Sequence, residues 1–280
     1  MKSLVSQFTR SLYVIPGGYF LVMFIRGLFK DKQLTPKWRT IQFRGIKMKL
    51  DLSKQMGSAI YWRGAHDWAP VFAMENLVNK GQTLVDIGAN QGEYTLWAAR
   101  KTGASGKVFA FEPLSTLFGQ LEENVRINEG FGAFVFPIRM GLSDQPGRLK
   151  LYSNDPYNEG VNTLFPGPGK TAFLEEISLS TLDAEVEKLN IQQVDFIKID
   201  VEGAELMVLK GAVETLKRFR PILFLELNET ACQAAGYSSS DIFALLEKLG
   251  YRFELIGLRG KTSPLDKTKL PEFCNIIAKA

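Results

Sequence analysis

From residue 83 onward, the chain alternates short apolar runs with longer segments whose apolar residues recur at helical spacing. This alternation is typical of βαβ units and predicts a doubly wound α/β fold around a mostly parallel sheet. Helices cover both faces of such a sheet, so its strands are apolar along their whole length, as these runs are. The expected strands are Thr83–Ile87, Lys107–Glu112, Phe134–Ile138, Val194–Asp200, Ile222–Leu227, Tyr251–Ile256 and Phe273–Ala278.

The segment from Asn154 to Lys170 interrupts this pattern because it is rich in proline and glycine. Such a composition predicts a loop. The flanking segments Arg148–Ser153 and Ile177–Leu182 resemble strands, so we expect a β insertion in the domain. A loop of this length in a compact domain often has a functional role, for example as a lid.

The amino-terminal part of the chain carries a high net positive charge. Residues 1–54 contain eleven Lys or Arg and two acids, a local net charge of +9, which leaves about −5 for the rest of a chain whose total is +4. A basic segment ahead of an acidic domain favours contact with an anionic surface. We therefore expect a basic, partly apolar and helical extension over residues 1–55 and the α/β domain over residues 56–280.

Fifteen uncharged residues, many of them apolar, lie between Arg10 and Arg26. A membrane-spanning helix needs ~20 apolar residues, so this stretch is too short to span. It also lacks the small-residue cleavage site of a signal peptide. Two interpretations remain: a helix packed on the core or at a homo-oligomer interface, or an interfacial helix on an anionic membrane, flanked by Arg26, Lys30 and Lys32.

Two cysteines, Cys232 and Cys274, are too few for a disulfide framework. A reducing, cytoplasmic setting is therefore expected, with peripheral membrane contact as an addition to it.

The most specific signal is the segment from Leu84 to Thr95, in which an apolar strand enters a tight turn and a helix starts directly afterwards. Gly88 and Gly92 permit the sharp turn and the close approach of a ligand, with Ala89 and Asn90 between them. Asp86 lies near the end of the strand, where its carboxylate can accept hydrogen bonds from a polar or cationic ligand group.

The next strand ends in Glu112 and Pro113, and Glu112 lies twenty residues past Gly92. An acid at this place after a glycine turn can bind both hydroxyls of a ribose. The turn and the acid together predict a ligand that contains adenosine.

The turn itself distinguishes between two such ligands. Dinucleotide sites have the pattern G-x-G-x-x-G and hold a pyrophosphate at the start of the helix. Here Asn90 replaces the second glycine, and Glu93 places a negative charge at the helix start, where it would repel a pyrophosphate. The sequence therefore favours S-adenosylmethionine, and an NAD-dependent oxidoreductase remains the alternative.

The strand over residues 194–200 carries Lys198 and ends in Asp200, with Glu202 directly after it. In a doubly wound sheet the fourth strand lies beside the first, and ligands bind at the carboxyl ends of both. Asp200 and Glu202 are thus expected near the reacting end of the cofactor, where either can act as a general base. Lys198 is expected to be buried and therefore to need a carboxylate partner.

Two further residues are candidates for a cation-binding or catalytic role in this site. Glu226 ends the next strand and could hold a divalent cation together with Asp200 and Glu202, but the spacing is not a metal signature, so we assign no metal. His66 is the only histidine and lies between Arg63 and Trp68. It is the alternative general base, although a packed histidine without a chemical role would look the same in sequence.

These motifs resemble those of the FkbM family of methyltransferases. The similarity includes Val85-Asp-Ile-Gly-Ala-Asn90, Phe109-Ala-Phe-Glu-Pro113, Leu142-Ser-Asp144, Ser180-Thr-Leu-Asp183 and Phe196-Ile-Lys-Ile-Asp-Val-Glu-Gly-Ala-Glu205. The likeness covers roughly residues 60–230 and does not account for the amino-terminal 55 or so residues.

The resemblance implies a class I methyltransferase fold, with seven strands of which the last is antiparallel, and the cofactor S-adenosylmethionine. It also implies O-methylation of a hydroxyl on a sugar or other small metabolite. By this resemblance Asp86, Gly88, Asn90 and Glu112 contact the cofactor, Ser143 and Asp144 lie near its adenine, and Asn162-Thr163-Leu164 faces the acceptor. Gln91 and Glu93 depart from the apolar or small aromatic residues common in the family.

Two other kinds of partner were considered. A non-catalytic, membrane-associated module that only binds the cofactor is a second alternative to the enzyme. Nucleic acid is not expected as a partner, because no basic and aromatic platform for stacked bases is evident and the acidic half of the chain opposes phosphate binding.

Overall fold

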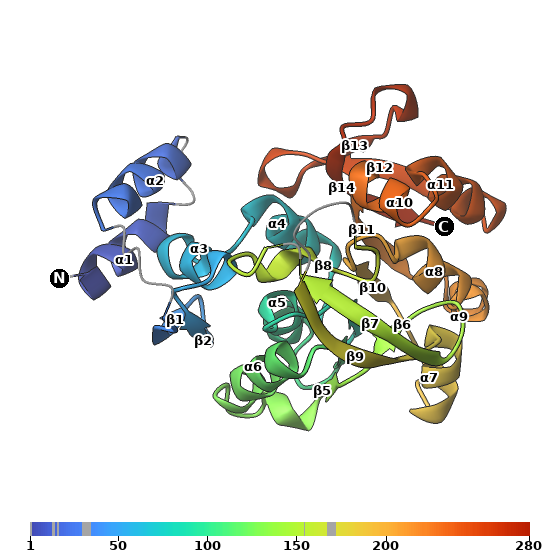
Figure 1. Cartoon of the computed structure of the whole chain (residues 1–280), viewed down its shortest axis with the longest axis horizontal. Coiled ribbons are helices and arrows are strands. Elements are labelled where there is room, and N and C mark those ends of the chain that lie inside the picture. The colour runs from blue at the N-terminus through green and yellow to red at the C-terminus, as the bar shows by residue number, and fades with distance from the viewer. Residues whose placement is uncertain (1, 13–14, 16, 30–34, 154, 167–171) are drawn as a thin grey trace.

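The computed structural model describes residues 2–12, 15, 17–29, 35–153, 155–166 and 172–280. Its centre is an eight-stranded sheet with helices packed on both faces (Figure 1). The strands of this sheet are β3 (Thr83–Ile87), β4 (Lys107–Phe111), β5 (Val135–Ile138), β10 (Phe196–Ile199), β11 (Ile222–Asn228), β12 (Arg252–Ile256), β13 (Thr262–Pro264) and β14 (Phe273–Lys279).

The strands lie in the order β13-β12-β14-β11-β10-β3-β4-β5. The five from β11 to β5 are parallel to one another, and β14 runs antiparallel to both of its neighbours. The chain reverses its direction of winding between β3 and β10, so the carboxyl ends of these two strands form the place where such sheets bind ligands. The predicted doubly wound fold with an antiparallel last strand is confirmed.

The expected count of seven strands was wrong by one. After β12 the short helix η4 (Leu258–Gly260) turns the chain back, and β13 pairs antiparallel with the outer edge of β12. This added edge lies far from the switch point between β3 and β10, so it leaves the site unchanged.

Residues along each central strand alternate between two cores, as the pleat of a strand requires. Leu84 packs with helices α4 to α6, whereas its neighbour Val85 packs with α7 to α11. The helices are α4 (Trp68–Leu77), α5 (Glu93–Thr102), α6 (Ser115–Arg126), α7 (Leu182–Lys188), α8 (Glu205–Lys210), α9 (Val213–Phe219), α10 (Glu229–Ala234) and α11 (Ser239–Lys248), with single 3₁₀ turns η2 (Phe131–Ala133) and η5 (Lys267–Lys269).

The predicted β insertion forms a second, four-stranded sheet, in which β9 lies between β6 and β7 and β8 pairs with the outer edge of β7. The second predicted strand begins five residues earlier and ends at Ser180, because Thr181 caps α7 with its side chain. Residues 154 and 167–171 of the predicted loop lie outside the described residues. The elements are β6 (Gly141–Leu142), β7 (Gly147–Ser153), η3 (Glu159–Val161), β8 (Asn162–Thr163) and β9 (Ala172–Ser180).

The amino-terminal extension is helical only in its first half. The helices α1 (Lys2–Ser11) and α2 (Gly18–Leu28) precede a hairpin of β1 (Trp38–Phe43) and β2 (Ile46–Asp51), and α3 (Gln55–Arg63) follows it. The hairpin was not predicted. The side chains of Asn124 on α6 and of Asn128 just after it accept the backbone N–H groups of Lys49 and Lys47 in β2, respectively.

These bonds fasten the hairpin to the α/β domain, and the division at residue 55 stays a prediction. Within the described ranges, no helix combines the length and the apolar character needed to cross a bilayer.

Gly88 tests how closely β3 and β10 approach each other. Its φ is +78°, and a Cβ there would lie 1.9 Å from the backbone oxygen of Asp200. We expect Gly88→Ala to lower the free energy of unfolding by ~2–4 kcal/mol, because alanine disfavours the positive φ and its Cβ would push the end of β10 away from the turn. Chemical denaturation followed by circular dichroism measures this change.

The matched control is Gly119→Ala, since a Cβ at Gly119 on α6 would meet no atom within 4 Å. Helix propensity predicts a gain of ~0.5–1 kcal/mol for this control. Equal changes for the two variants would contradict the close approach at Gly88.

Candidate active site

The turn after β3 is shaped by the end of β4 and by the end of β10. The backbone N–H groups of Gly88 and Ala89 both donate to the carbonyl of Phe111. Asn90 follows with φ of 52°, a left-handed conformation that non-glycine residues rarely adopt. Such strain persists only where the surroundings enforce it, and it concentrates at functional sites.

Glu112 lies directly beside this turn. Its Oε2 accepts the backbone N–H of Asn90 at 2.8 Å, and its Oε1 accepts that of Leu114 at 2.9 Å. Burial raises the pKa of Glu112 to about 7, although the two backbone donors oppose the rise. Each carboxylate oxygen still has a free lone pair for a ligand donor, because it accepts only one bond here.

A cavity of about 880 Å³, part of it open to solvent, lies over the carboxyl ends of β3, β4 and β10. Seven of the predicted site residues line it: Gly88, Ala89, Asn90, Glu112, Pro113, Asp200 and Glu202. The apolar wall includes Phe111, Leu117, Met140, Leu142, Leu151, Ile177 and Leu179.

Five predicted residues do not line the cavity. Gly92 opens α5, where a Cβ would press on Leu121. Ser143 and Asp144 bond to each other next to the wall formed by Met140, Gly141 and Leu142. Asp86 and His66 lie behind the lining residues. The roles assigned to all five therefore stay predictions.

Lys198 is fully buried and connects β3 with the end of β10. Its Nζ lies 3.3 Å from Asp86 Oδ1 and 3.2 Å from Asp200 Oδ2, and it donates to the carbonyl of Gly88 at 3.0 Å. Burial alone would lower the pKa of Lys198, but the carboxylates of Asp200 and Asp86 outweigh it and raise that pKa. The predicted carboxylate partner of Lys198 is confirmed, and there are two.

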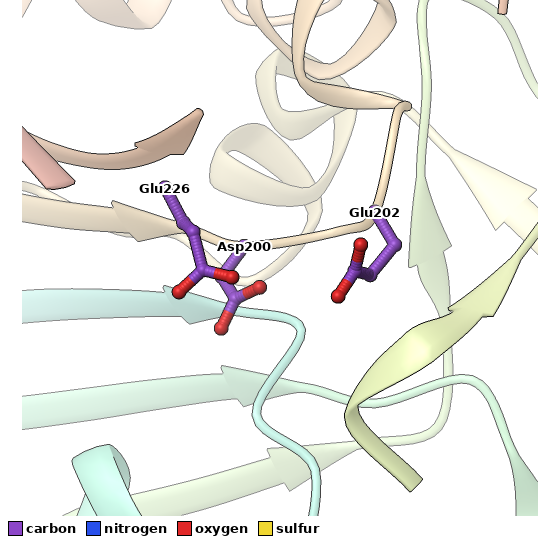
Figure 2. Close-up of side chains that lie close together, drawn as sticks. All are labelled: Asp200, Glu202 and Glu226. Atoms are coloured by element: carbon purple, nitrogen blue, oxygen red, sulfur yellow. The ribbon is translucent and has the colours of Figure 1, made fainter. Parts of the chain in front are cut away.

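Asp200, Glu202 and Glu226 each place one carboxylate oxygen within 4.8 Å of the others (Figure 2). Burial, together with the charge of Asp200, raises the pKa of Glu202 to about 8. The same causes and the charge of Glu202 raise the pKa of Glu226 to about 9. Because Lys198 neutralises only part of this charge, the cluster holds protons at neutral pH that ordinary glutamates would have lost.

Glu93 is a cavity residue that the sequence analysis used only as an argument against pyrophosphate. Its Oε1 accepts the backbone N–H of His66, and its Oε2 is buried with no hydrogen-bond partner among the described residues. Burial raises the pKa of Glu93 to about 7. An unsatisfied buried oxygen that lines a cavity needs a donor, so Glu93 is suited to a polar or cationic ligand group.

His66 does not line the cavity; its backbone N–H donates to Oε1 of Glu93, which does. Burial, followed by the charge of Arg63, lowers the pKa of His66, so the neutral imidazole prevails at neutral pH. The charges of Asp67 and Asp200 oppose this shift.

Segments distant in sequence complete the cavity. Met56 from α3 and Glu159 from η3 line one side, together with Asn162 and Leu164 of the insertion. The amide of Asn90 donates to the carbonyl of Glu159, and Thr163 Oγ1 donates to the carbonyl of Glu202. The insertion is therefore bonded to both the glycine turn and the acidic end of the site, which none of the motifs predicted.

The family model described as the methyltransferase FkbM domain matches residues 86–253, a region that runs from Asp86 to β12 and contains most of the cavity. This chain belongs to the FkbM methyltransferase family. The resemblance seen in the sequence motifs is thereby confirmed.

Two curated relatives have methyltransferase names. Methyltransferase sdnD of Sordaria araneosa is 30% identical over 159 residues, which cover 47% of this chain and 60% of that protein. Hexuronic acid methyltransferase AglP of Haloferax volcanii is 29% identical over 177 residues, which cover 62% of this chain and 65% of that protein. This FkbM chain thus spans less than two thirds of the length of either relative.

Among solved structures, methyltransferase FkbM from Methylobacillus flagellatus matches with 17% identity and a TM-score of 0.49, over 75% of this chain and 48% of that one. So distant a match carries no argument about the site. The fold assignment rests on the strand order described above.

Glu226 provides a test of the buried charge in this site. The pKa of Glu226 is about 9 in the folded protein, against an ordinary value of 4.5. The folded protein therefore loses stability through this group as the pH rises between these two values. Glutamine does not ionise, so Glu226→Gln should raise the melting temperature more at pH 9 than at pH 6. Thermal melts over this pH series measure the difference.

The control is Glu187→Gln, which removes the same charge from an exposed position on α7. We expect this control to shift the melting temperature little at any pH. A shift for Glu226→Gln that is the same at pH 6 and pH 9 would contradict the assignment of a raised pKa.

Proposed function

We propose that this FkbM chain binds S-adenosylmethionine in the cavity and catalyses methylation of a hydroxyl on a sugar or other small metabolite. The observation that carries the proposal is that one cavity is lined both by Glu112, an acid placed to bind ribose hydroxyls, and by the acids Asp200 and Glu202. The first belongs beside the glycine turn, as an adenosine site requires, and the second lies at the end of β10.

The residues present fit this cofactor. Glu112 would hold the ribose, because each of its oxygens has a lone pair left for one hydroxyl. The apolar wall suits the adenine ring, and Glu93 Oε2 offers the acceptor that an α-ammonium group needs. When bound, the cofactor would supply a methyl group already activated by a positively charged sulfur.

The chain itself must orient the acceptor hydroxyl and remove its proton. Glu202 is our first choice as general base, since it lines the cavity and its pKa of about 8 lies near working pH. Asp200 is the second choice because its carboxylate is already paired with Lys198, 3.2 Å away. His66 is the alternative base if the acceptor approaches from the side of α4.

The cavity charge favours an uncharged acceptor. Five carboxyl groups line the cavity and Lys198 is the single basic side chain among its described lining residues. A further negative charge is therefore disfavoured, and a neutral sugar hydroxyl suits the site better than the uronic acid in the name of the Haloferax relative.

The buried thiols of Cys232 and Cys274 are unpaired, which agrees with a reducing, cytoplasmic setting.

Calorimetric titration with S-adenosylhomocysteine and with NAD tests the cofactor proposal. We expect the first to bind and the second not, since Glu93 at the start of α5 opposes a pyrophosphate. Glu112→Gln should weaken S-adenosylhomocysteine binding by roughly 10–100-fold, because charged hydrogen bonds to the ribose are lost.

The matched control is Glu122→Gln, which removes the same charge from an exposed position on α6. We expect it to bind like the wild type. Tighter binding of NAD than of S-adenosylhomocysteine would overturn the proposal and favour the oxidoreductase.

The general base can be tested by methyl transfer from labelled S-adenosylmethionine to a panel of neutral glycosides, uronic acids and cell extract. We expect turnover to rise as the pH rises through about 8, because only ionised Glu202 accepts a proton. Glu202→Gln should reduce kcat by roughly 10²–10⁴-fold and leave S-adenosylhomocysteine binding intact.

The control Glu214→Gln, on the exposed surface of α9, should keep full turnover. Full turnover by Glu202→Gln would remove Glu202 as the base. Cofactor binding without labelling of any acceptor in the panel would favour the non-catalytic module instead.

A further inference from the structure

The helix α1 is oriented with its polar side toward the protein. Thr9 Oγ1 donates to the carbonyl of Trp62, and Arg10 donates to the carbonyl of Tyr61, both at 2.8 Å and both near the end of α3. Leu4 and Phe8 point outward and are 72% and 59% exposed. This is the reverse of an ordinary surface helix, whose apolar stripe faces the core.

The helix α2 is fastened to the protein along one edge only. Val22 is buried in the core, and Phe29 directly after the helix packs on Trp62, with ring centroids 5.5 Å apart. The remaining sides are apolar and exposed, with Phe20 at 75% and Leu28 at 69%.

We call the exposed large apolar side chains of both helices, together with Ile15 between them, the α1–α2 face: Leu4, Phe8, Ile15, Tyr19, Phe20, Leu21, Met23, Phe24 and Leu28. Half of the exposed large apolar side chains in the described part of the chain are in this set, although it spans only residues 4–28. Figure 1 shows α1 and α2 together at one end of the molecule, away from the strands β12 to β14. So concentrated a patch is typical of an interaction surface.

Charge identifies the kind of surface that covers this face. Residues 1–54 carry a net charge of +9, and Arg39 on β1 is exposed. Residues 4–28 themselves hold only Arg10 and Arg26 as charged residues, and a second copy bound through the same face would bring the flanking basic segments of both copies closer together, which is unfavourable. A bilayer with anionic lipids takes up both the apolar side chains and the positive charge.

We propose that residues 1–28 bind the protein to anionic membranes, with α1 and α2 lying in the plane of the interface. At eleven residues α2 is ~16 Å long and cannot cross a hydrocarbon core of ~30 Å, so its apolar residues enter one leaflet only. The polar inner side of α1 keeps its bonds to α3 in this arrangement.

Membrane binding would also orient the cavity. The helix α3 accepts the bonds from Thr9 and Arg10 near its end, and Met56 in its first turn lines the cavity. One short helix therefore connects the α1–α2 face to the site. This inference does not depend on the proposed chemistry, because vesicle binding requires neither cofactor nor acceptor.

The test is flotation of the full chain with phosphatidylcholine vesicles that contain about a third phosphatidylserine. We expect binding to these vesicles, and at least ~10-fold less binding to pure phosphatidylcholine or in about 0.5 M salt. The double variant Phe20→Ser/Phe24→Ser should lose at least ~10-fold of the binding, because two exposed apolar side chains no longer enter the leaflet.

The matched control is Leu258→Ser, which removes an 89% exposed apolar side chain from η4 and should bind vesicles like the wild type. Thermal melts of both variants should match the wild type, which shows that folding is intact. Absence of wild-type binding, or equal binding to neutral vesicles, would overturn the proposal. The face would be assigned to a second copy instead if the wild type bound no vesicles, was a dimer by light scattering, and became a monomer in the double variant.

Discussion

The buried ammonium group of Lys198 is the interaction on which the site depends. It lies between Asp86 on β3 and Asp200 at the end of β10, and it also bonds to the carbonyl of Gly88. The buried carboxylate of Asp86 depends on this partner, because an isolated buried charge is far more costly than a paired one. The close approach of the two strands, and with it the cavity over their ends, follows from this pairing and from the missing side chain of Gly88.

The pairing also divides the acids of the site into two kinds. Asp200 forms an ion pair with Lys198, whereas Glu202 and Glu226 both receive the negative charge of Asp200. Burial is the first cause of the raised pKa values of Glu202 and Glu226, and the charge of Asp200 is the second. A residue that must accept a proton near neutral pH needs such a neighbour, since an ordinary glutamate is too weak a base. The structural ion pair and the chemistry proposed for Glu202 therefore have the same origin.

Sequence alone predicted the parts of the site that depend on strand ends. Glu112 and Asp200 follow apolar strands, and the carboxyl ends of neighbouring parallel strands meet at one edge of a sheet, so their convergence needs no further information. Glu93 could not be placed in this way, because its burial depends on the backbone of His66 from a separate segment. The hairpin over residues 38–51 was missed for a similar reason, since Asn124 on α6 and Asn128 after it hold β2 from 75 and 81 residues away.

Part of the cavity wall was not predicted, although the resemblance implied that Asn162-Thr163-Leu164 faces the acceptor. Met56 and Glu159 reach the cavity from the amino-terminal region and from the insertion, where no motif marks them. Bonds from Asn90 to Glu159 and from Thr163 to Glu202 connect this side of the cavity to the turn and to the acidic cluster. A change of acceptor can therefore come from the insertion and from α3, while Lys198 and Glu112 stay as they are. Because α3 also accepts the bonds from α1, the proposed membrane binding would act on the same helix that lines this side of the cavity.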